Sequence, residues 1–331
     1  MKVVIPTAGY GTRLRPHTWS KPKPLISVAG KPVLGHVLDM FATLPRLEEV
    51  IFIVGYLGGQ IEAYVRQAYP QLRCRCVEQP EMLGQSHAIW LAREGLTGPM
   101  LMVFVDTLIE ADLTNIEQPG VGALAWVKQV PDPRRFGVAE VGADGWVTRL
   151  IEKPASIDNN LAVVGFYYFE RSEDLISAIE QQMARNAQLK GEFFLVDAIN
   201  IMLEQGLRMR TRSVQIWQDC GKAESLLETN AYLLDHGRDN SDVASKRNGV
   251  VVVPPVFIDP SADVSESVIG PHVSIGPECS IRRSVLRNSI VDAGSHIVDT
   301  TLSASLIGRE ARVIGRDRIL NVGDSSEVGF S

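Results

Sequence analysis

Glycines and basic side chains follow the first apolar run of the chain at a spacing suited to a polyphosphate. After Val3–Ile5 the sequence reads GYGTR from Gly9 to Arg13, and a basic segment punctuated by prolines, Lys21–Pro24, follows. Glycine lets backbone N–H groups approach an anion closely, and arginine and lysine offset its charge. Leu14 stands at the third glycine position of a dinucleotide loop, and no Walker Gly-Lys-Ser/Thr follows. The pattern therefore predicts a phosphate site of another kind.

Strand-like and helix-like segments alternate through the first two thirds of the chain, and they must position this loop. Such alternation indicates an α/β fold: a Rossmann-like, mostly parallel sheet with helices on both faces. Ligands of such sheets gather at the carboxyl ends of the strands, where the run LMVFVD places Asp106. Strands are predicted at Lys2–Pro6, Val50–Val54, Leu72–Val77, Met100–Val105, Gly122–Val127 and Ala162–Phe169, and helices at 33–44, Gly58–Tyr69, Gln85–Glu94, Asp174–Arg185, Leu195–Gln205 and Lys222–Leu234.

The last third of the chain has a different periodicity. Residues 236–249 (HGRDNSDVASKRNG) are polar and aperiodic, which predicts a linker. Beyond them an aliphatic residue recurs every five or six positions, as at Ile269, Ile275 and Ile281, and a small or β-branched residue stands four positions after each. This hexapeptide repeat predicts a left-handed parallel β-helix of three or four coils. We therefore predict a catalytic domain at 1–235, a linker at 236–249 and a hexapeptide-repeat domain at 250–331. Because short β-helices need capping or assembly at their ends, a homo-oligomer is expected.

Composition narrows the class of partner to small molecules. The formal net charge of −6 disfavours nucleic acid and anionic membrane surfaces, so a basic site must be local. The chain contains no apolar run long enough to span a membrane and enters a strand at its N-terminus, so a cytoplasmic location without membrane contact is expected. The four cysteines lack a zinc spacing and are expected to be reduced and structural. They are Cys74, Cys76, Cys220 and Cys279.

The motifs resemble those of the sugar nucleotidyltransferases, which join a nucleoside triphosphate to a sugar 1-phosphate. Members carry an A/G-G-x-G-T-R-L loop and a P-K-P/A-L-x-P-V-x-G-K-P segment. The corresponding segments here are Ala8–Leu14 and Pro22–Pro32, with Ile26–Ser27 where many members have a proline. The resemblance extends over residues 1–235. It is closest to glucose-1-phosphate thymidylyltransferases and uridylyltransferases with a C-terminal hexapeptide-repeat domain.

The resemblance implies a role for each matching residue. Val105 departs from the glycine that usually precedes the first metal-binding aspartate, and Val196 replaces the threonine of the family's G-E-x-x-x-T-D segment. The implied roles are catalysis by Arg13 and Lys23; nucleotide binding by Ala8, Gly9, Gly11, Thr12, Gln79 and Gly84; sugar-phosphate binding by Gly137, Glu152, Lys153 and Gly165; and Mg²⁺ binding by Asp106 and Asp219.

The implied reaction explains why no catalytic triad is needed. Its nucleophile is a sugar phosphate oxygen, already largely deprotonated at neutral pH because the second phosphate pKa is about 6. Catalysis then requires alignment of two polyanions and neutralisation of charge at the α-phosphorus, which arginine, lysine, backbone N–H groups and Mg²⁺ supply. We therefore expect an in-line displacement that releases pyrophosphate.

The segment from Gln79 to Ala88 (QPEMLGQSHA) resembles the part of the family that reads the base. By this resemblance Gln79 pairs with the edge of a pyrimidine, and Gly84 lets the base lie close to the backbone. The Q-x-x-x-x-G-x-x-H-A form of this segment is closer to that of uridylyltransferases, in which threonine commonly occupies the position of Gln85. His87 is interpreted as structural.

Several substrate pairs and functions stay open. The leading hypothesis is dTTP with glucose 1-phosphate. The alternative is UTP with glucose 1-phosphate or N-acetylglucosamine 1-phosphate, since one methyl group is worth only about 1–3 kcal/mol of discrimination. An added acetyltransferase activity would use the β-helix, where His272 and His296 lie in regular repeats. A non-catalytic regulatory subunit is the third hypothesis, but such chains typically lose the loop cations or the metal aspartates.

Overall fold

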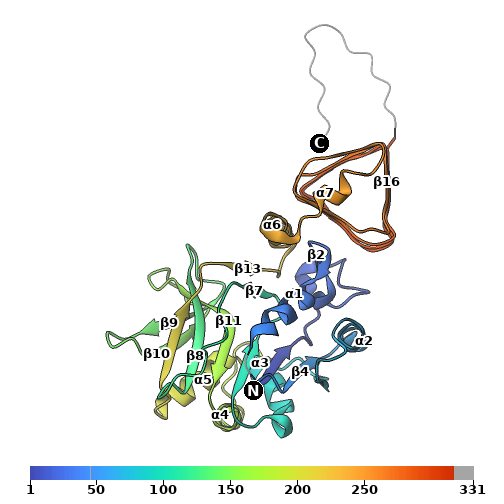
Figure 1. The fold of residues 1–331 in the computed structure, drawn as a ribbon. Helices are drawn as coiled ribbons and strands as arrows, with labels where there is room; N and C mark the ends of the chain where they lie inside the picture. Colours follow the sequence, from blue (N-terminus) through green and yellow to red (C-terminus); the bar gives the residue numbers. More distant parts are fainter. Residues whose placement is uncertain (45, 317–331) are drawn as a thin grey trace. The chain divides into compact units, whose positions relative to one another are not determined.

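The structure, a computed structural model, describes residues 1–44 and 46–316 (Figure 1). Its contacts divide the chain into two compact units. The first contains Met1–Ile26 and Lys31–Thr229, and the second contains Ser27–Gly30 together with the chain from Asn230 onward. No helix in the described ranges is both long and apolar enough to cross a membrane.

A mixed sheet of nine strands, counted over the described residues, forms the centre of the first unit. Four strands are parallel in the order β6-β1-β4-β5, and antiparallel pairs involving β9, β10 and β11 extend the sheet beyond β6. This arrangement confirms the predicted fold class. The strands are β1 (Lys2–Pro6), β4 (Glu49–Val54), β5 (Cys74–Glu78), β6 (Met100–Val103), β8 (Ala123–Gln129), β9 (Gly137–Val141), β10 (Val147–Glu152), β11 (Leu161–Phe169) and β12 (Met209–Ser213).

Helices cover the sheet where the sequence predicts them. Right-handed crossovers place the helices between β1, β4 and β5 on one face. The chain then returns past β1 to reach β6, which places the next helix on the other face. The residues of that face form a hydrophobic core with Ile89, Ile179 and Ile199, which are all fully buried. The helices of this unit are α1 (Val33–Met40), α2 (Gly58–Ala68), α3 (Gln85–Leu91), α4 (Ser172–Ala184), α5 (Leu195–Glu204) and α6 (Ala223–Leu233), the last of which continues into the second unit.

Three parts of the sheet region were not predicted. The β9–β10 hairpin turns through Asp144 and Gly145, an Asp-Gly signal that the sequence contains. Strand β12 alternates arginine with Met209, Thr211 and Ser213, and among the described strands it pairs only with β8. Its sequence therefore lacks the continuous apolar face of a buried strand. The short strands β7 (Thr107–Ile109) and β13 (Trp217–Asp219) pair with each other outside the main sheet.

Three four-stranded parallel sheets form the predicted β-helix of the second unit, seen nearly end-on as a triangle in Figure 1. The anchors Ile269, Ile275 and Ile281 are fully buried, which confirms the repeat. Pairs such as Val250–Ser267 and Val273–Ser289 set a coil length of 17 or 16 residues. The strands are β14 (Val250–Val252), β15 (Val256–Ile258), β16 (Asp263–Ser265), β17 (Ser267–Ile269), β18 (Val273–Ile275), β19 (Ser280–Arg282), β20 (Val285–Arg287), β21 (Ser289–Val291), β22 (His296–Val298), β23 (Thr301–Ser303), β24 (Leu306–Ile307) and β25 (Arg312–Ile314).

Coils shorter than three hexapeptides shift the spacing of the buried aliphatic residues after Ile281. Leu286, fully buried, lies five residues after that anchor and continues the row. Residues 236–249, the expected linker, include the short helix α7 (Ser241–Ala244), and Ala244 is part of the β-helix core.

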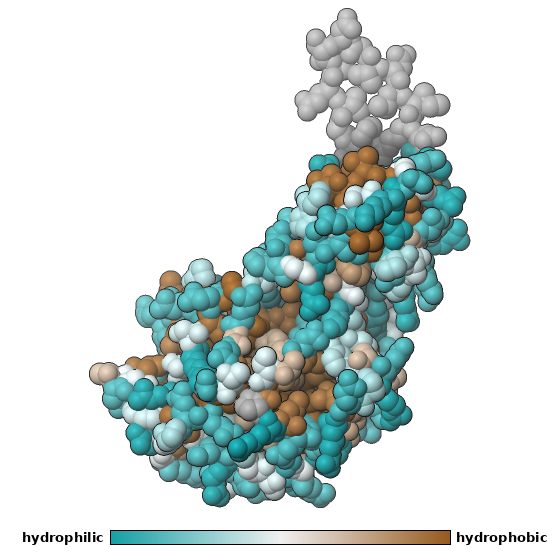
Figure 2. All heavy atoms as spheres, in the orientation of Figure 1, coloured by the Kyte–Doolittle hydropathy of each residue, from teal (hydrophilic) through white to brown (hydrophobic). Residues whose placement is uncertain are grey.

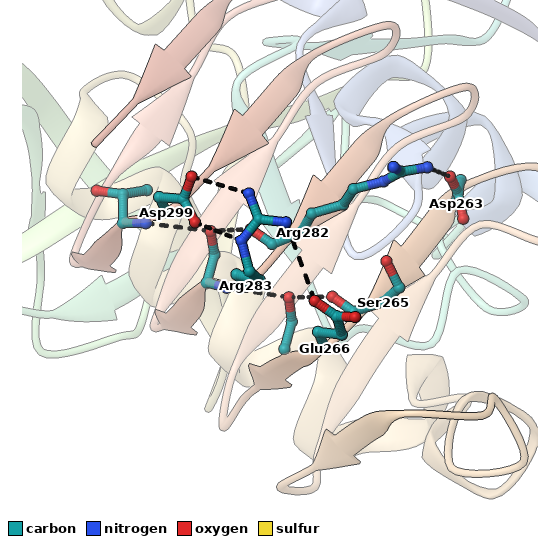
Figure 3. Close-up of polar contacts among 9 residues, drawn as sticks. Asp263, Ser265, Glu266, Arg282, Arg283 and Asp299 are labelled. Atoms are coloured by element: carbon teal, nitrogen blue, oxygen red, sulfur yellow. Dashed lines mark hydrogen bonds and ion pairs between the residues drawn. The ribbon is translucent and has the colours of Figure 1, made fainter. Parts of the chain in front are cut away.

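One corner of the β-helix carries a ladder of alternating charges (Figure 3). Glu266, Arg283 and Asp299 follow one another coil by coil, each with a positive φ. Arg283 Nε lies 2.6 Å from Asp299 Oδ1, and its Nη1 lies 4.0 Å from Glu266 Oε2. A positive φ is unfavourable for residues with a Cβ, so these corners are held by the coil hydrogen bonds on either side.

Asn230 is buried and forms hydrogen bonds with separate segments of the second unit. Its Oδ1 accepts hydrogen bonds from the Ala29 N–H at 2.9 Å and from Ser274 Oγ at 2.6 Å, and its Nδ2 donates to the His272 carbonyl at 3.1 Å. The segment Ser27–Gly30 is therefore held by residues far away in the sequence. At Gly30 an added Cβ would lie 2.3 Å from the Phe257 ring.

We predict that Asn230→Ala destabilises the second unit. The substitution removes the acceptor of the Ala29 N–H and of the Ser274 hydroxyl, and an unsatisfied buried group costs about 1–3 kcal/mol. Denaturant unfolding would measure the change against Asn248→Ala, an exposed asparagine of the same unit. Equal unfolding midpoints for the two variants would contradict the prediction.

Candidate active site

A continuous cleft opens within the first unit at the carboxyl ends of β1 and β6. The chain reverses its direction of travel across the sheet between these two strands, which is where ligands of α/β sheets bind. Three adjoining pockets form the cleft, and Gln85 lines all three. Every residue assigned a role by the family resemblance lines it: Ala8, Gly9, Gly11, Thr12, Arg13, Lys23, Gln79, Gly84, Asp106, Gly137, Glu152, Lys153, Gly165 and Asp219.

The visible surface of the first unit is of mixed polarity. Figure 2 shows hydrophilic residues over most of the first unit and hydrophobic residues gathered toward the middle of the visible face. The central pocket has a volume of about 390 Å³.

The glycine loop leads directly from β1 into this central pocket. Gly11 has a φ of 61°, and the Thr18 hydroxyl donates to its carbonyl at 2.9 Å. A Cβ at Gly11 would lie 3.0 Å from the Cβ of Lys23, so the loop passes tightly over the basic segment. Arg13 follows in a 3-10 turn, Thr12–Leu14, and lines the pocket with Lys23. Two cations therefore converge at the end of β1.

Lys23 and Asp106 form the central ion pair of the cleft. Lys23 Nζ lies 2.5 Å from Asp106 Oδ2, and the two side chains are 15% and 26% exposed. Burial raises the pKa of Asp106, but Lys23, and to a lesser extent Arg13, lower it further, so the net pKa lies below its usual range. Ionised Asp106 thus stabilises the fold at neutral pH, and this contribution is lost as the pH falls through the lowered pKa.

The β7–β13 pair brings the second aspartate to the first. Asp219 lies opposite Thr107, the residue after Asp106, and the Cys220 N–H donates to the Asp106 carbonyl at 2.8 Å. Asp219 Oδ1 accepts from the Gly221 N–H at 2.8 Å, while its Oδ2 has no donor among the described residues. Two carboxylates beside a pocket lined by Arg13 and Lys23 match the oxygen ligands that Mg²⁺ prefers. The residues present therefore fit a magnesium ion.

One side pocket contains the predicted base-reading residues. Gln79 is buried at the end of β5, and Gly84, with a φ of 98°, precedes α3. A Cβ at Gly84 would lie 2.6 Å from the backbone N and O of Phe193, so only glycine fits between these segments. Gln79 Nε2 donates to the Gly84 carbonyl at 3.1 Å.

The other side pocket contains the predicted sugar-phosphate residues. Burial raises the pKa of Glu152, opposed by Lys153, whose Nζ lies 3.4 Å from Glu152 Oε1. Lys153 has a φ of 47°, and its Nζ lies 4.7 Å from the centre of the Phe194 ring. Positive φ in a lysine is uncommon and is maintained only where the surroundings impose it.

Gly165 lies in an irregular stretch of β11, where the pairing with β8 shifts register. Its φ is 85°, and an added Cβ would lie 2.5 Å from Phe104 Cδ2. The Phe104 N–H donates to its carbonyl at 2.9 Å. Gly165 therefore sets the position of a ring that lines both the central pocket and the side pocket that contains Glu152.

Sequence reasoning did not assign roles to three cleft residues that the structure singles out. Gln85 Oε1 accepts from the Leu195 N–H at 3.3 Å, which leaves its amino group toward the pockets. The Trp217 ring packs edge-on against Phe136 with centroids 4.8 Å apart, and its indole N–H is buried without a partner among the described residues. The sequence contained a signal for each of them. Trp217 belongs to the W-x-D-x-G segment, Phe136 directly precedes Gly137, and Gln85 lies in the segment that resembles the base-reading part of the family.

Comparison with known proteins identifies the family. A sequence profile of the nucleotidyl transferase family matches residues 2–236. The chain belongs to this family. A glucose-1-phosphate thymidylyltransferase of Streptomyces antibioticus is 30% identical over 95% of this chain and 93% of its own length. A thymidylyltransferase of the same name from Streptomyces griseus is 28% identical over the full length of both. This nucleotidyl transferase is therefore a sugar-1-phosphate nucleotidylyltransferase.

Two further comparisons extend the family assignment. The bifunctional protein GlmU of Methanocaldococcus jannaschii is 30% identical over 79% of this chain and 61% of its own length. A crystal structure of UDP-glucose pyrophosphorylase complexed with UDP-glucose superimposes with a TM-score of 0.63 at 22% identity, over 71% of this chain and 98% of that chain. The superposition shows that the nucleotidyl transferase shares its fold.

We predict that Gly165→Ala destabilises the nucleotidyl transferase more than Gly191→Ala. Both glycines have similar positive φ values, 85° and 82°, so an alanine at either is strained by about 1–2 kcal/mol. Only at position 165 would the methyl group also overlap the Phe104 ring, which adds about 1–3 kcal/mol. Thermal unfolding of the two variants would compare them. If Gly191→Ala lost as much stability as Gly165→Ala, backbone strain alone would account for both losses, and the contact with Phe104 would have no effect.

Proposed function

We propose that this nucleotidyl transferase transfers a nucleotidyl group from dTTP or UTP to glucose 1-phosphate and releases pyrophosphate. The observation that carries the proposal is the order of groups along one cleft. A pocket with Gln79 and Gly84 leads to the cations Arg13 and Lys23, and then to a pocket with Glu152. This order follows the order of base, phosphates and sugar in a nucleotide sugar.

Charge balance explains what the central residues do in the proposed reaction. Arg13 and Lys23 bind the triphosphate and offset charge that develops at the α-phosphorus and on the leaving pyrophosphate. Lys153 attracts the sugar phosphate, whose oxygen is the nucleophile and requires no general base. Glu152, partly buried in the same pocket, accepts hydrogen bonds from sugar hydroxyls. The glycine loop allows backbone N–H groups to approach the phosphates.

Asp106 and Asp219 would hold Mg²⁺ in this proposal. The ion supplies charge neutralisation and orientation of phosphate oxygens when bound. Asp106 is paired with Lys23 here, so a polyphosphate that attracts Lys23 makes the carboxylate available to the ion. The cation and the nucleotide are therefore expected to bind synergistically.

Pyrophosphate release should require a pyrimidine triphosphate, one sugar 1-phosphate and Mg²⁺. The panel would test dTTP, UTP, GTP, CTP and ATP against glucose 1-phosphate and N-acetylglucosamine 1-phosphate. Chelation with EDTA should abolish release, and added Mg²⁺ should restore it. Full activity in EDTA would refute the metal role, and preference for a purine triphosphate would refute the assignment of the base pocket.

Lys23→Met and Asp106→Asn should each lower kcat by about 100-fold or more, because charge stabilisation of the transition state typically has that magnitude. Lys128→Met and Asp112→Asn change the same residue types outside the cleft and should retain activity. Steady-state kinetics would be measured on variants whose thermal unfolding shows that they fold. Wild-type kcat in folded Lys23→Met would remove this residue from the catalytic machinery.

The match to GlmU favours one alternative, a uridylyltransferase for N-acetylglucosamine 1-phosphate with acetyltransferase activity in the β-helix. His272 would be the first candidate for that second activity. Its Nε2 lies 3.1 Å from Asp235 Oδ1, within the second unit. Acetyl transfer from acetyl-CoA to glucosamine 1-phosphate, lost in His272→Ala, would support the alternative.

A further inference from the structure

The amide of Gln79 is held by two hydrogen-bond acceptors. Its Nε2 lies 3.1 Å from the Gly84 carbonyl oxygen and 3.2 Å from His87 Nδ1. A carbonyl oxygen can only accept, so the side-chain atom facing it must be the amino group. It follows that His87 Nδ1 also accepts, and that the ring carries its proton on Nε2.

His87 is itself fixed in place. The side chain is buried on α3, and its ring stacks on Trp90 at 6.3 Å with an interplanar angle of 21°. The guanidinium carbon of Arg93 lies over the Trp90 ring, 3.7 Å from its centre, and the Trp90 indole N–H donates to Glu180 Oε1 at 3.3 Å. Burial lowers the pKa of His87, against a smaller opposing effect of Glu81, which favours the neutral ring that can accept.

These contacts determine which atom of Gln79 remains for a ligand. With both N–H groups engaged, Oε1 is left, and no described residue donates to it. Gln79 lines the side pocket together with Gly84 and Ala88. The pocket therefore presents a hydrogen-bond acceptor. Uracil and thymine have an N3–H donor between two carbonyls, whereas cytosine has an N3 acceptor, which would face Oε1 without a proton.

We propose that His87 is a positioning residue that selects uracil and thymine over cytosine by fixing the orientation of the Gln79 amide. The inference rests on the proposed function, because it assumes that the base binds in this pocket. Loss of the Nδ1 acceptor leaves Gly84 as the single described acceptor for the amino group and leaves one of its N–H groups without a partner. This weakens the preference for the observed orientation, so the flipped amide, which presents its N–H groups to cytosine N3, becomes more populated.

The test compares kcat/KM for dTTP and dCTP in wild type, His87→Leu and His87→Asn. We expect His87→Leu to lower the dTTP preference at least tenfold, and His87→Asn to keep it, because the asparagine Oδ1 can replace Nδ1 as acceptor. Ser86→Ala removes a buried, unpartnered hydroxyl on the same helix and should leave the preference unchanged. In a Gln79→Leu background His87→Leu should have no further effect on the preference, because His87 acts through Gln79. An unchanged preference in folded His87→Leu would overturn the proposal.

A second measurement separates failure of this proposal from failure of the proposed function. In ¹⁵N NMR spectra of the ligand-free wild type, we expect an unprotonated Nδ1 and a protonated Nε2 at His87. Gln79→Leu should shift the Nδ1 resonance, because it removes the donor. A proton on Nδ1 would overturn the assigned amide orientation whatever the enzyme's substrates are. The expected tautomer in a protein that uses no pyrimidine triphosphate would refute the proposed function and, with it, the selection of bases by His87.

Discussion

The contact between Lys23 and Asp106 is the interaction on which the rest of the cleft depends. Lys23 follows the glycine loop after β1, and Asp106 follows β6, its parallel neighbour in the sheet. Each charge is partly removed from water, so each stabilises the other, and loss of one would leave the other uncompensated. In the proposed reaction a polyphosphate would compete with Asp106 for Lys23, and a divalent cation would compete with Lys23 for Asp106. Two oppositely charged ligands would then enter together without leaving either side chain unpaired.

Backbone contacts then determine how the polar side chains face that centre. Gly84 accepts from Gln79, and the Leu195 N–H donates to Gln85, so one amide presents an oxygen and the other an amino group. The two glutamines are chemically identical, yet their surroundings give them opposite hydrogen-bonding character. In this cleft, the hydrogen-bonding character that a glutamine presents is thus determined by the neighbouring main chain as much as by the side chain itself.

The sequence predicted the parallel part of the sheet, and the residues that it singled out line one cleft, because both follow local rules. The apolar strand β1 is followed by a glycine turn and then by basic residues. Parallel strands bring their carboxyl ends to one edge of the sheet. The limits of the prediction are equally physical. Strand β12 forms by pairing with β8 despite its arginines. Strand β13 has 3 residues, too few to show the alternation of apolar and polar residues that predicts a strand. Which atom of Gln79 faces the pocket depends on His87 and Gly84, whose distances only the folded chain determines.

The segment Ser27–Gly30 has a consequence for how this molecule can be divided. The chain leaves the first unit after Ile26, returns at Lys31, and leaves again at Asn230, whose side chain holds Ala29. Joining the first unit to another C-terminal unit at a single junction would separate that loop from the asparagine that fits it. Recombination between relatives is therefore constrained at two distant places at once. In evolution, the loop that follows Lys23 and the tail that begins at Asn230 are expected to be inherited as a matched pair.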